Sequence, residues 1–186
     1  MTNTTPSQTN PDGTRPNTQA SDGSVLNGSV SAQGPNSASD LPSANHRVIG
    51  TVLTDQPLEP LRDEASRLVP DATAGAVVTF DGIIRNHDGG QAVDELLYTA
   101  HPSARQELAR VVAEIAAEFP QVRVWAAHRT GKLGIGELAF AVIVASAHRK
   151  EAFAACAELA ERVKATVPIW KEQFLSDGRA QWVGLD

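Results

Sequence analysis

The chain of 186 residues contains a single cysteine, Cys156. One thiol excludes an intramolecular disulfide framework, and it also excludes a zinc site built from several cysteines. Cys156 falls on the apolar side of a helical pattern described below. We therefore expect a small buried side chain at this position and not a reactive thiol.

Long apolar runs and an excess of basic charge are also missing. No stretch approaches the roughly 20 apolar residues of a membrane-spanning helix, and Met1 is followed by polar residues in place of a signal peptide. The 16 Lys and Arg residues are outnumbered by 22 Asp and Glu residues, for a net charge of −6. This balance argues against a nucleic-acid partner. The sequence predicts a cytoplasmic protein with no nucleic-acid or membrane partner, in which any anion site comes from a local cluster.

Aromatic residues make up 5% of the chain, and none of them lies in residues 1–45. Ser, Thr, Asn, Gln, Pro and Gly fill 32 of these 45 positions. Such a segment cannot bury enough apolar surface to offset the entropy lost on ordering. We expect a disordered tail over 1–45 and one folded domain over 46–186.

The rest of the chain alternates between the periodicities of strands and helices. Helices are expected at 60–68, 103–119 and from 146 onward. Strands are expected at 46–58, 75–84, 93–101, 121–128, 138–145, 169–174 and 181–183, with a loop at 85–90, a glycine-punctuated turn at 129–136 and a turn at 176–178. Paired strands between helices predict an α+β fold with a mainly antiparallel sheet and three helices.

The third helix has the clearest pattern. Phe153, Cys156 and Val163 fall on one apolar stripe, Ser146 is a suitable N-cap, and Pro168 is expected to stop the helix. The first turn is unusual because it carries His148, Arg149 and Lys150 where the helix dipole favours acidic residues. Free N–H groups together with added cations suit an anion, although a solvated basic turn explains them equally well.

Three more cations stand at ordered positions. Arg85 leaves a strand and enters a loop containing Gly89 and Gly90, Lys164 lies near a helix end, and Lys171 lies in a strand beside Trp170. Each has a simpler structural explanation: a surface loop, the helix dipole and stacking on Trp170. Together with His148 and Arg149 they predict an anion site without specifying a reaction. No histidine pairs with another metal-binding residue at a ligand-like spacing, so no metal site is expected.

Four segments, taken in order, resemble one protein family. They are GAVVTFDGIIRNHDGG (75–90), HRTGKLGIGE (128–137), VASAHRKEAF (144–153) and KATVPIWKEQ (164–173). Over residues 46–184 the chain resembles the large, catalytic subunit of molybdopterin synthase. The combination of RNH, SAHR and two lysines separated by six residues, the second within PIWK, is specific, whereas any one of these motifs alone is weak.

The resemblance implies an α/β-hammerhead fold and a sulfur transfer. Two dithiolene sulfurs enter cyclic pyranopterin monophosphate and give molybdopterin, without a bound cofactor. The sulfur donor is a small ubiquitin-like subunit whose C-terminal Gly-Gly carries a thiocarboxylate. Two large subunits form a central dimer within a heterotetramer.

The resemblance also implies which residues bind the substrate, and among them Lys164 and Lys171 are implied to be catalytic. The set is Ile83, Ile84, Arg85, His148, Arg149, Lys164, Lys171, Glu172 and Gln173. A non-catalytic phosphoanion-binding or scaffold protein on the same fold is the alternative, and the presence of both lysines favours the enzyme.

Overall fold

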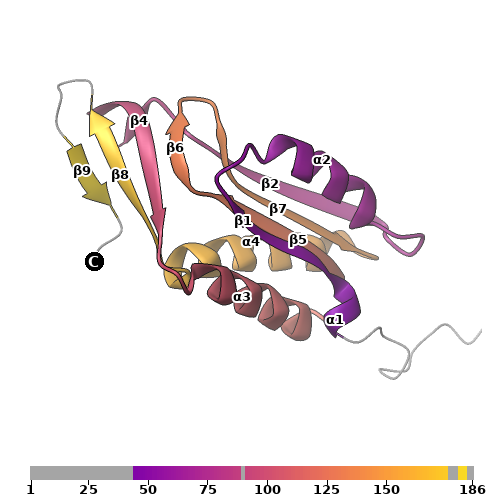
Figure 1. Ribbon diagram of the computed structural model, residues 1–186. Helices are drawn as coiled ribbons and strands as arrows, with labels where there is room; N and C mark the ends of the chain where they lie inside the picture. The colour runs from indigo at the N-terminus through magenta and orange to yellow at the C-terminus, as the bar shows by residue number, and fades with distance from the viewer. Residues whose placement is uncertain (1–43, 89–90, 176–179, 184–186) are drawn as a thin grey trace, which may run out of the picture. The chain divides into compact units, whose positions relative to one another are not determined.

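The computed structural model describes residues 44–88, 91–175 and 180–183 (Figure 1). The tail expected at 1–45 falls outside this range except for its last two residues, as does the turn expected at 176–178. The elements in chain order are α1 (Ala44–Arg47), β1 (Val48–Thr54), α2 (Glu59–Leu68), β2 (Ala76–Ile83), β3 (His87–Asp88), β4 (Gln91–Ala100), α3 (Ala104–Glu118), β5 (Val122–Arg129), β6 (Gly131–Gly134), β7 (Leu138–Ser146), α4 (Arg149–Thr166), β8 (Ile169–Leu175) and β9 (Ala180–Val183).

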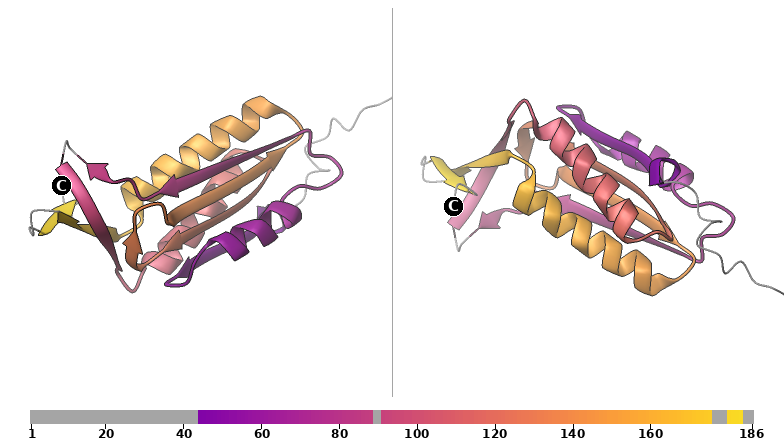
Figure 2. Two further views of the ribbon diagram at one scale, coloured as in Figure 1. Left: turned by 90° about the horizontal axis from the view of Figure 1, so that it is seen from above. Right: turned by 90° about the horizontal axis from the view of Figure 1, so that it is seen from below.

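The first sheet has the strand order β1-β5-β7-β2, with only the β1–β5 pair parallel. All nine residues of β7 are buried, as its near-continuous apolar sequence predicts for a central strand. Helices α3 and α4 pack on one face of this sheet, and α2 packs on the other (Figure 2). None of the helices in the described ranges is long and apolar enough to cross a membrane.

Helix α4 follows its predicted stripe with two differences. Cys156, Leu159 and Val163 are buried as expected, but Phe153 is 62% exposed. The N-cap is His148, not Ser146. Ser146 still belongs to β7, where it pairs with Ala76 of β2 and Val122 of β5, so hydrogen bonding on both sides holds it in the sheet.

The second sheet lies at one end of the first and is built around β4, which pairs with β3, β6 and β8, while β9 pairs with β8. The prediction of a turn over 129–136 is wrong in its middle, because β6 pairs residues 131–134 with Glu95–Tyr98 of β4. Gly131 and Gly136 do adopt the positive φ angles that glycine permits. The loop expected at 85–90 likewise contains the short strand β3. The α+β class, the mainly antiparallel pairing and the three long helices are confirmed.

Candidate functional site

A cavity of about 460 Å³ lies where the two sheets meet the C-terminal end of α4. Four parts of the chain line it: the end of β2 with the residues after it, the facing ends of β5 and β7, the last turns of α4, and β4 with β8. The lining residues are Phe80, Gly82, Ile83, Ile84, Arg85, His87, Leu96, Tyr98, His128, Ala139, Phe140, Val163, Lys164, Val167, Ile169, Lys171 and Gln173.

Three of the predicted cations converge on this cavity. Arg85 comes from the segment after β2, Lys164 from α4 and Lys171 from β8. The ammonium of Lys164 lies over the ring of Phe80, 5.3 Å from its centroid, which is within the range of a cation–π contact. The structure therefore brings together residues that are 86 positions apart in the sequence, from Arg85 to Lys171.

The segment carrying Arg85 is fixed by the turn between β6 and β7. The backbone N–H of Ile84 donates to the carbonyl of Glu137 at 3.0 Å, and the N–H of Gly136 donates back to Ile84 at 2.8 Å. The Glu137 carboxylate accepts the N–H of Gly134 at 2.7 Å and pairs with Arg129 at 3.2 Å. These two contacts lower the pKa of Glu137, the backbone hydrogen bond contributing most. The HRTGKLGIGE segment thus supports the loop that presents Ile83, Ile84 and Arg85.

Strand alternation divides the predicted segment 171–173. Lys171 pairs with Tyr98 and Gln173 pairs with Leu96, and all four residues line the cavity. Glu172 pairs with Leu97, and neither of these two lines the cavity. Since successive side chains of a strand face opposite sides, Glu172 is directed away from the site that the sequence predicted for it.

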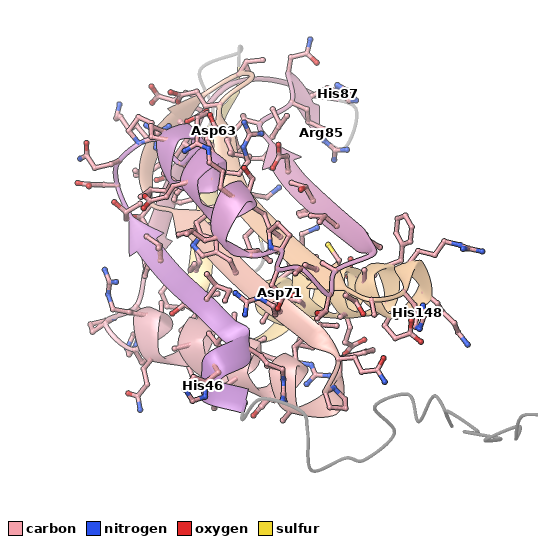
Figure 3. All side chains as sticks on the ribbon, turned by 90° about the vertical axis from the view of Figure 1, so that its right-hand side faces the viewer. His46, Asp63, Asp71, Arg85, His87 and His148 are labelled. Atoms are coloured by element: carbon pink, nitrogen blue, oxygen red, sulfur yellow. The ribbon has the colours of Figure 1, made fainter. Side chains whose placement is uncertain are left out.

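His148 and Arg149 do not join the other predicted residues within one chain. They line a separate hollow at the N-terminus of α4, together with Gly75, Ala147, Lys150 and Glu151. The 16 residues from His148 to Lys164 place the two groups roughly 24 Å apart along the helix. Figure 3 shows His148 well separated from Arg85. Within one chain, the structure therefore brings Arg85, Lys164 and Lys171 together but leaves His148 and Arg149 apart from them.

The packing around this hollow depends on a glycine. A Cβ atom at Gly75 would collide with the carbonyl oxygen of Ala147, so only glycine allows this close approach. The N–H of Gly75 donates to the carbonyl of Ser146 at 3.0 Å. The turn before β2 is thereby held directly against the chain that leads into α4.

A row of aromatic rings in the cavity was not predicted. The His128 ring stacks on Phe140 and meets the edge of Tyr98, with centroids 5.3 and 5.2 Å apart, and Phe140 meets Phe80 at 5.7 Å. The sequence predicted a strand at 75–84, which contains Phe80, but sequence alone does not show that this strand borders a cavity. His128 is 9% exposed, and burial lowers its pKa to about 4.

The other reactive groups lie outside this cavity. Cys156 is buried in the core between α4 and the first sheet, and burial raises the pKa of its thiol to about 11. Among the residues that the structure describes, no three His, Cys, Asp or Glu side chains gather as a metal site would require. The cavity therefore offers fixed cations, an aromatic floor and no carboxylate among its described lining residues.

Comparisons with known proteins agree on one family. Residues 53–166 match the family described as MoaE protein. Molybdopterin synthase catalytic subunit 1 of Mycobacterium tuberculosis is 41% identical over 71% of this chain and 88% of its own length. The molybdopterin synthase catalytic subunit of Pyrococcus abyssi is 38% identical over 67% of this chain and 84% of its own. The crystal structure of molybdopterin synthase from Staphylococcus aureus is similar with a TM-score of 0.65 and 32% identity, covering 70% of this chain and 94% of that one.

Proposed function

Since the chain belongs to the MoaE family, the molybdopterin synthase catalytic subunits of molybdenum cofactor biosynthesis, we propose that it inserts sulfur into cyclic pyranopterin monophosphate. The convergence of Arg85, Lys164 and Lys171 on one cavity carries this proposal. The sulfur donor is the thiocarboxylate at the C-terminal Gly-Gly of a small ubiquitin-like subunit, whose extended tail enters the cavity.

Electrostatics explains why such a reaction needs a cationic site. The cyclic phosphate and the thiocarboxylate are both anions, and at ~4 Å their repulsion is about 4 kcal/mol at an effective dielectric constant near 20. Three cations around one cavity offset this repulsion without a metal ion. Arg85 binds the phosphate, because a guanidinium donates several hydrogen bonds in a fixed geometry.

The two lysines, Lys164 and Lys171, assist the making and breaking of bonds in the reaction. Each thiocarboxylate sulfur bonds to a substrate carbon and displaces an oxygen from it: at one carbon the phosphate oxygen leaves as the cyclic phosphate opens to a monoester, and at the other the oxygen leaves as water. The sulfur is then still joined to the terminal glycine of the donor as a thioester. Water then cleaves the thioester, so the sulfur stays on the product and the donor leaves as a carboxylate. Two donor tails are consumed for each dithiolene. Lys164 stabilises the negative charge on the thioester oxygen during cleavage, and Lys171 is the second catalytic lysine in the same cavity.

A second copy of the chain completes the site. The family resemblance assigns His148 and Arg149 to the substrate, yet they lie roughly 24 Å from Lys164 in their own chain. Strand β2 is at the edge of the first sheet, and α4 lies along it (Figure 2). The hollow containing His148 lies at one end of β2 and the cavity lies at the other.

This arrangement suits a two-fold axis near the middle of β2. Such an axis places the N-terminal end of β2 in one chain beside the C-terminal end of β2 in the other. His148 and Arg149 of one copy then reach Arg85 of the other. The exposed side chains of Val77 and Ile83 on β2 and of Phe153 on α4 give this edge an apolar surface to bury. We therefore include a homodimer, within a heterotetramer with two small subunits, in the proposal.

Substitution of Lys164 tests the proposed catalysis. Loss of an ammonium that stabilises developing charge lowers turnover by about a hundredfold or more, so we expect that effect for Lys164→Ala. Lys164→Arg does not restore turnover, because a planar guanidinium neither replaces a compact ammonium nor acts as an acid near neutral pH. The measurement is single-turnover product formation with a saturating thiocarboxylated small subunit.

Lys132→Ala is the matched control, since Lys132 is an exposed lysine on β6 outside the cavity and we expect it to keep full turnover. A thermal melt verifies that both variants are folded. Near wild-type turnover in folded Lys164→Ala would remove Lys164 from the catalytic machinery. If Lys171→Ala were also active, neither lysine would be catalytic. Absence of turnover by the wild-type protein itself would instead favour the non-catalytic phosphoanion-binding protein.

A further inference from the structure

We propose that His128 is a substrate-recognition residue, whose Nε2 atom accepts a hydrogen bond from an N–H group of the substrate's heterocycle. This inference rests on the proposed function, because it takes a pterin-like ring as the occupant of the cavity. It assigns to the floor of the cavity a role different from that of the cations at its edge.

The hydrogen bonding of His128 determines its tautomer. Nδ1 lies 2.8 Å from the carbonyl oxygen of Arg129, and a carbonyl only accepts, so Nδ1 carries the hydrogen. Nε2 of the neutral ring is then an acceptor. Among the described residues no hydrogen bond to Nε2 is formed, and the ring lines the cavity. A ligand in the cavity is therefore the available donor.

The surroundings of His128 keep the ring neutral and fixed in place. Tyr98 and Phe140 pack against it, and the burial that lowers its pKa to about 4 leaves it uncharged at neutral pH. The charged side chains that line the same cavity are Arg85, Lys164 and Lys171, all cations, which further disfavour a protonated imidazole. Nε2 therefore remains a hydrogen-bond acceptor at neutral pH.

An acceptor is scarce in this cavity. The three cations only donate hydrogen bonds, and no carboxylate is among the described lining residues. Tyr98 and Gln173, whose side chains carry the oxygen atoms of the lining, each already have an interaction partner, and His87, the other imidazole in the lining, is exposed whereas His128 is buried. A pterin ring presents N–H donors on its pyrimidine edge, and a buried donor without a partner is costly. His128 supplies that partner, while the aromatic rings around it cover the planar face of the ligand.

Replacement of His128 by phenylalanine tests the assignment. His128→Phe keeps a ring beside Phe140 but removes the acceptor. We expect KM for cyclic pyranopterin monophosphate to rise about tenfold to a hundredfold, as for a site that loses a hydrogen bond to its substrate. We expect kcat to change less than about threefold, since a ground-state contact to the ring affects binding more than chemistry. His46→Phe, at an exposed histidine in α1, is the matched control and leaves both constants unchanged.

Inorganic phosphate separates recognition from a structural role. Phosphate competes through the cations and does not use the acceptor, so its inhibition constant stays the same in His128→Phe. His128→Gln, which restores an acceptor near Nε2, recovers part of the substrate affinity. An unchanged KM in His128→Phe overturns the inference. So does a parallel loss of phosphate affinity, because that result means the cavity has collapsed.

The wild-type protein provides a test that does not depend on any variant folding. With ¹⁵N-labelled histidine, the Nε2 signal of His128, a neutral imidazole with its hydrogen on Nδ1, should shift when the substrate is added, and should not shift with inorganic phosphate. Absence of a shift overturns the inference even if the substrate is converted. Absence of any conversion by the wild-type protein with its thiocarboxylated partner contradicts the proposed function instead, so the two failures are distinguishable.

Discussion

Neighbouring residues on β8 face opposite sides of the second sheet, and their roles differ accordingly. Gln173 is buried and lines the cavity with Lys171, whereas Glu172 pairs with Leu97 outside it. A carboxylate directed into the cavity would repel the anionic substrate that we propose and weaken the effect of the lysines. The period of two residues in a strand therefore keeps the negative charge of Glu172 off the face of β8 that lines the cavity.

Stability at acidic pH depends on His128. Its pKa is about 4 in the folded protein and near 6.5 when unfolded, so between these values the unfolded chain binds more protons. The free energy of unfolding consequently falls as pH is lowered from about 6.5 to about 4, by up to ~3 kcal/mol from this group. Above pH 6.5 this loss is absent.

Urea denaturation at pH 7 and pH 4.5 measures this effect. We expect His128→Phe to lose less stability than the wild type between the two values. Carboxylates such as Glu137, whose pKa values are lowered in the folded state, also lose stability towards acid, but they are present in both proteins and cancel. An identical loss in both proteins would contradict the assignment of a buried neutral imidazole.

Helix α4 runs from the hollow that contains His148 to the cavity that contains Lys164. Its N-terminus carries His148 and Arg149, and Lys164 lies near its other end, so its 18 residues fix the spacing between them. The helix is attached to α3 by Arg162, which donates to Glu118 through both terminal nitrogens at 2.6 and 2.9 Å and to Glu158 at 2.7 Å. These contacts raise the pKa of Arg162, with Glu118 contributing most.

Substitution of Arg162 should weaken the attachment of α4 to α3 and lower the stability of the protein. We expect Arg162→Gln to lower Tm by about 2–4 °C at low salt, since a bidentate network exceeds a single exposed pair but is still screened by solvent. The difference should shrink in 1 M salt. Arg67→Gln on α2 is the control, because Arg67 is exposed and forms no ion pair with the described residues. Equal Tm changes in both variants would show that the network contributes nothing.

At the scale of the whole molecule, one chain contains all the predicted residues but divides them between the cavity and the hollow at the N-terminus of α4. The edge strand β2 spans roughly 23 Å over its eight residues, close to the spacing along α4 that separates the two groups. A two-fold axis near its middle therefore brings the end with Arg85 to the hollow with His148 of a second copy. The proposed dimer forms two identical sites in this way.

Co-expression of two inactive variants tests this arrangement. In a mixed dimer of Lys164→Ala and Arg149→Ala chains, one site carries both substitutions and the other carries none. Random pairing makes half of the dimers mixed, so about a quarter of the wild-type activity should return. Product formation by the co-purified dimers is the measurement.

The pair Lys164→Ala and Lys171→Ala is the matched control. Both lysines line the same cavity of one chain, so every site of a mixed dimer lacks one of them and activity does not return. Recovery in neither pair would contradict a site shared between two copies. Recovery in both pairs would contradict the grouping of the lysines in a single cavity.

The order of the long elements was predictable from the sequence because local patterns determine it. The apolar period of β7, the stripe through Cys156 and Val163, and the stop before Pro168 depend on residues close together in the chain. The motifs that carry Arg85, Lys164 and Lys171 were recognisable for the same reason. Strand β6 was missed because Gly131 and Gly136 are typical of turns, and only the pairing with β4 makes the segment between them extended.

Only the tertiary structure decided which predicted residues meet. Packing of the second sheet against the end of α4 creates the cavity, adds the ring of His128 to it and leaves Glu172 outside. Pairing on both sides of β7 keeps Ser146 in the sheet, so α4 begins only after His148. The length of that helix separates His148 from Lys164. Sequence patterns report local periods and charges, whereas these outcomes depend on contacts between segments far apart in the chain.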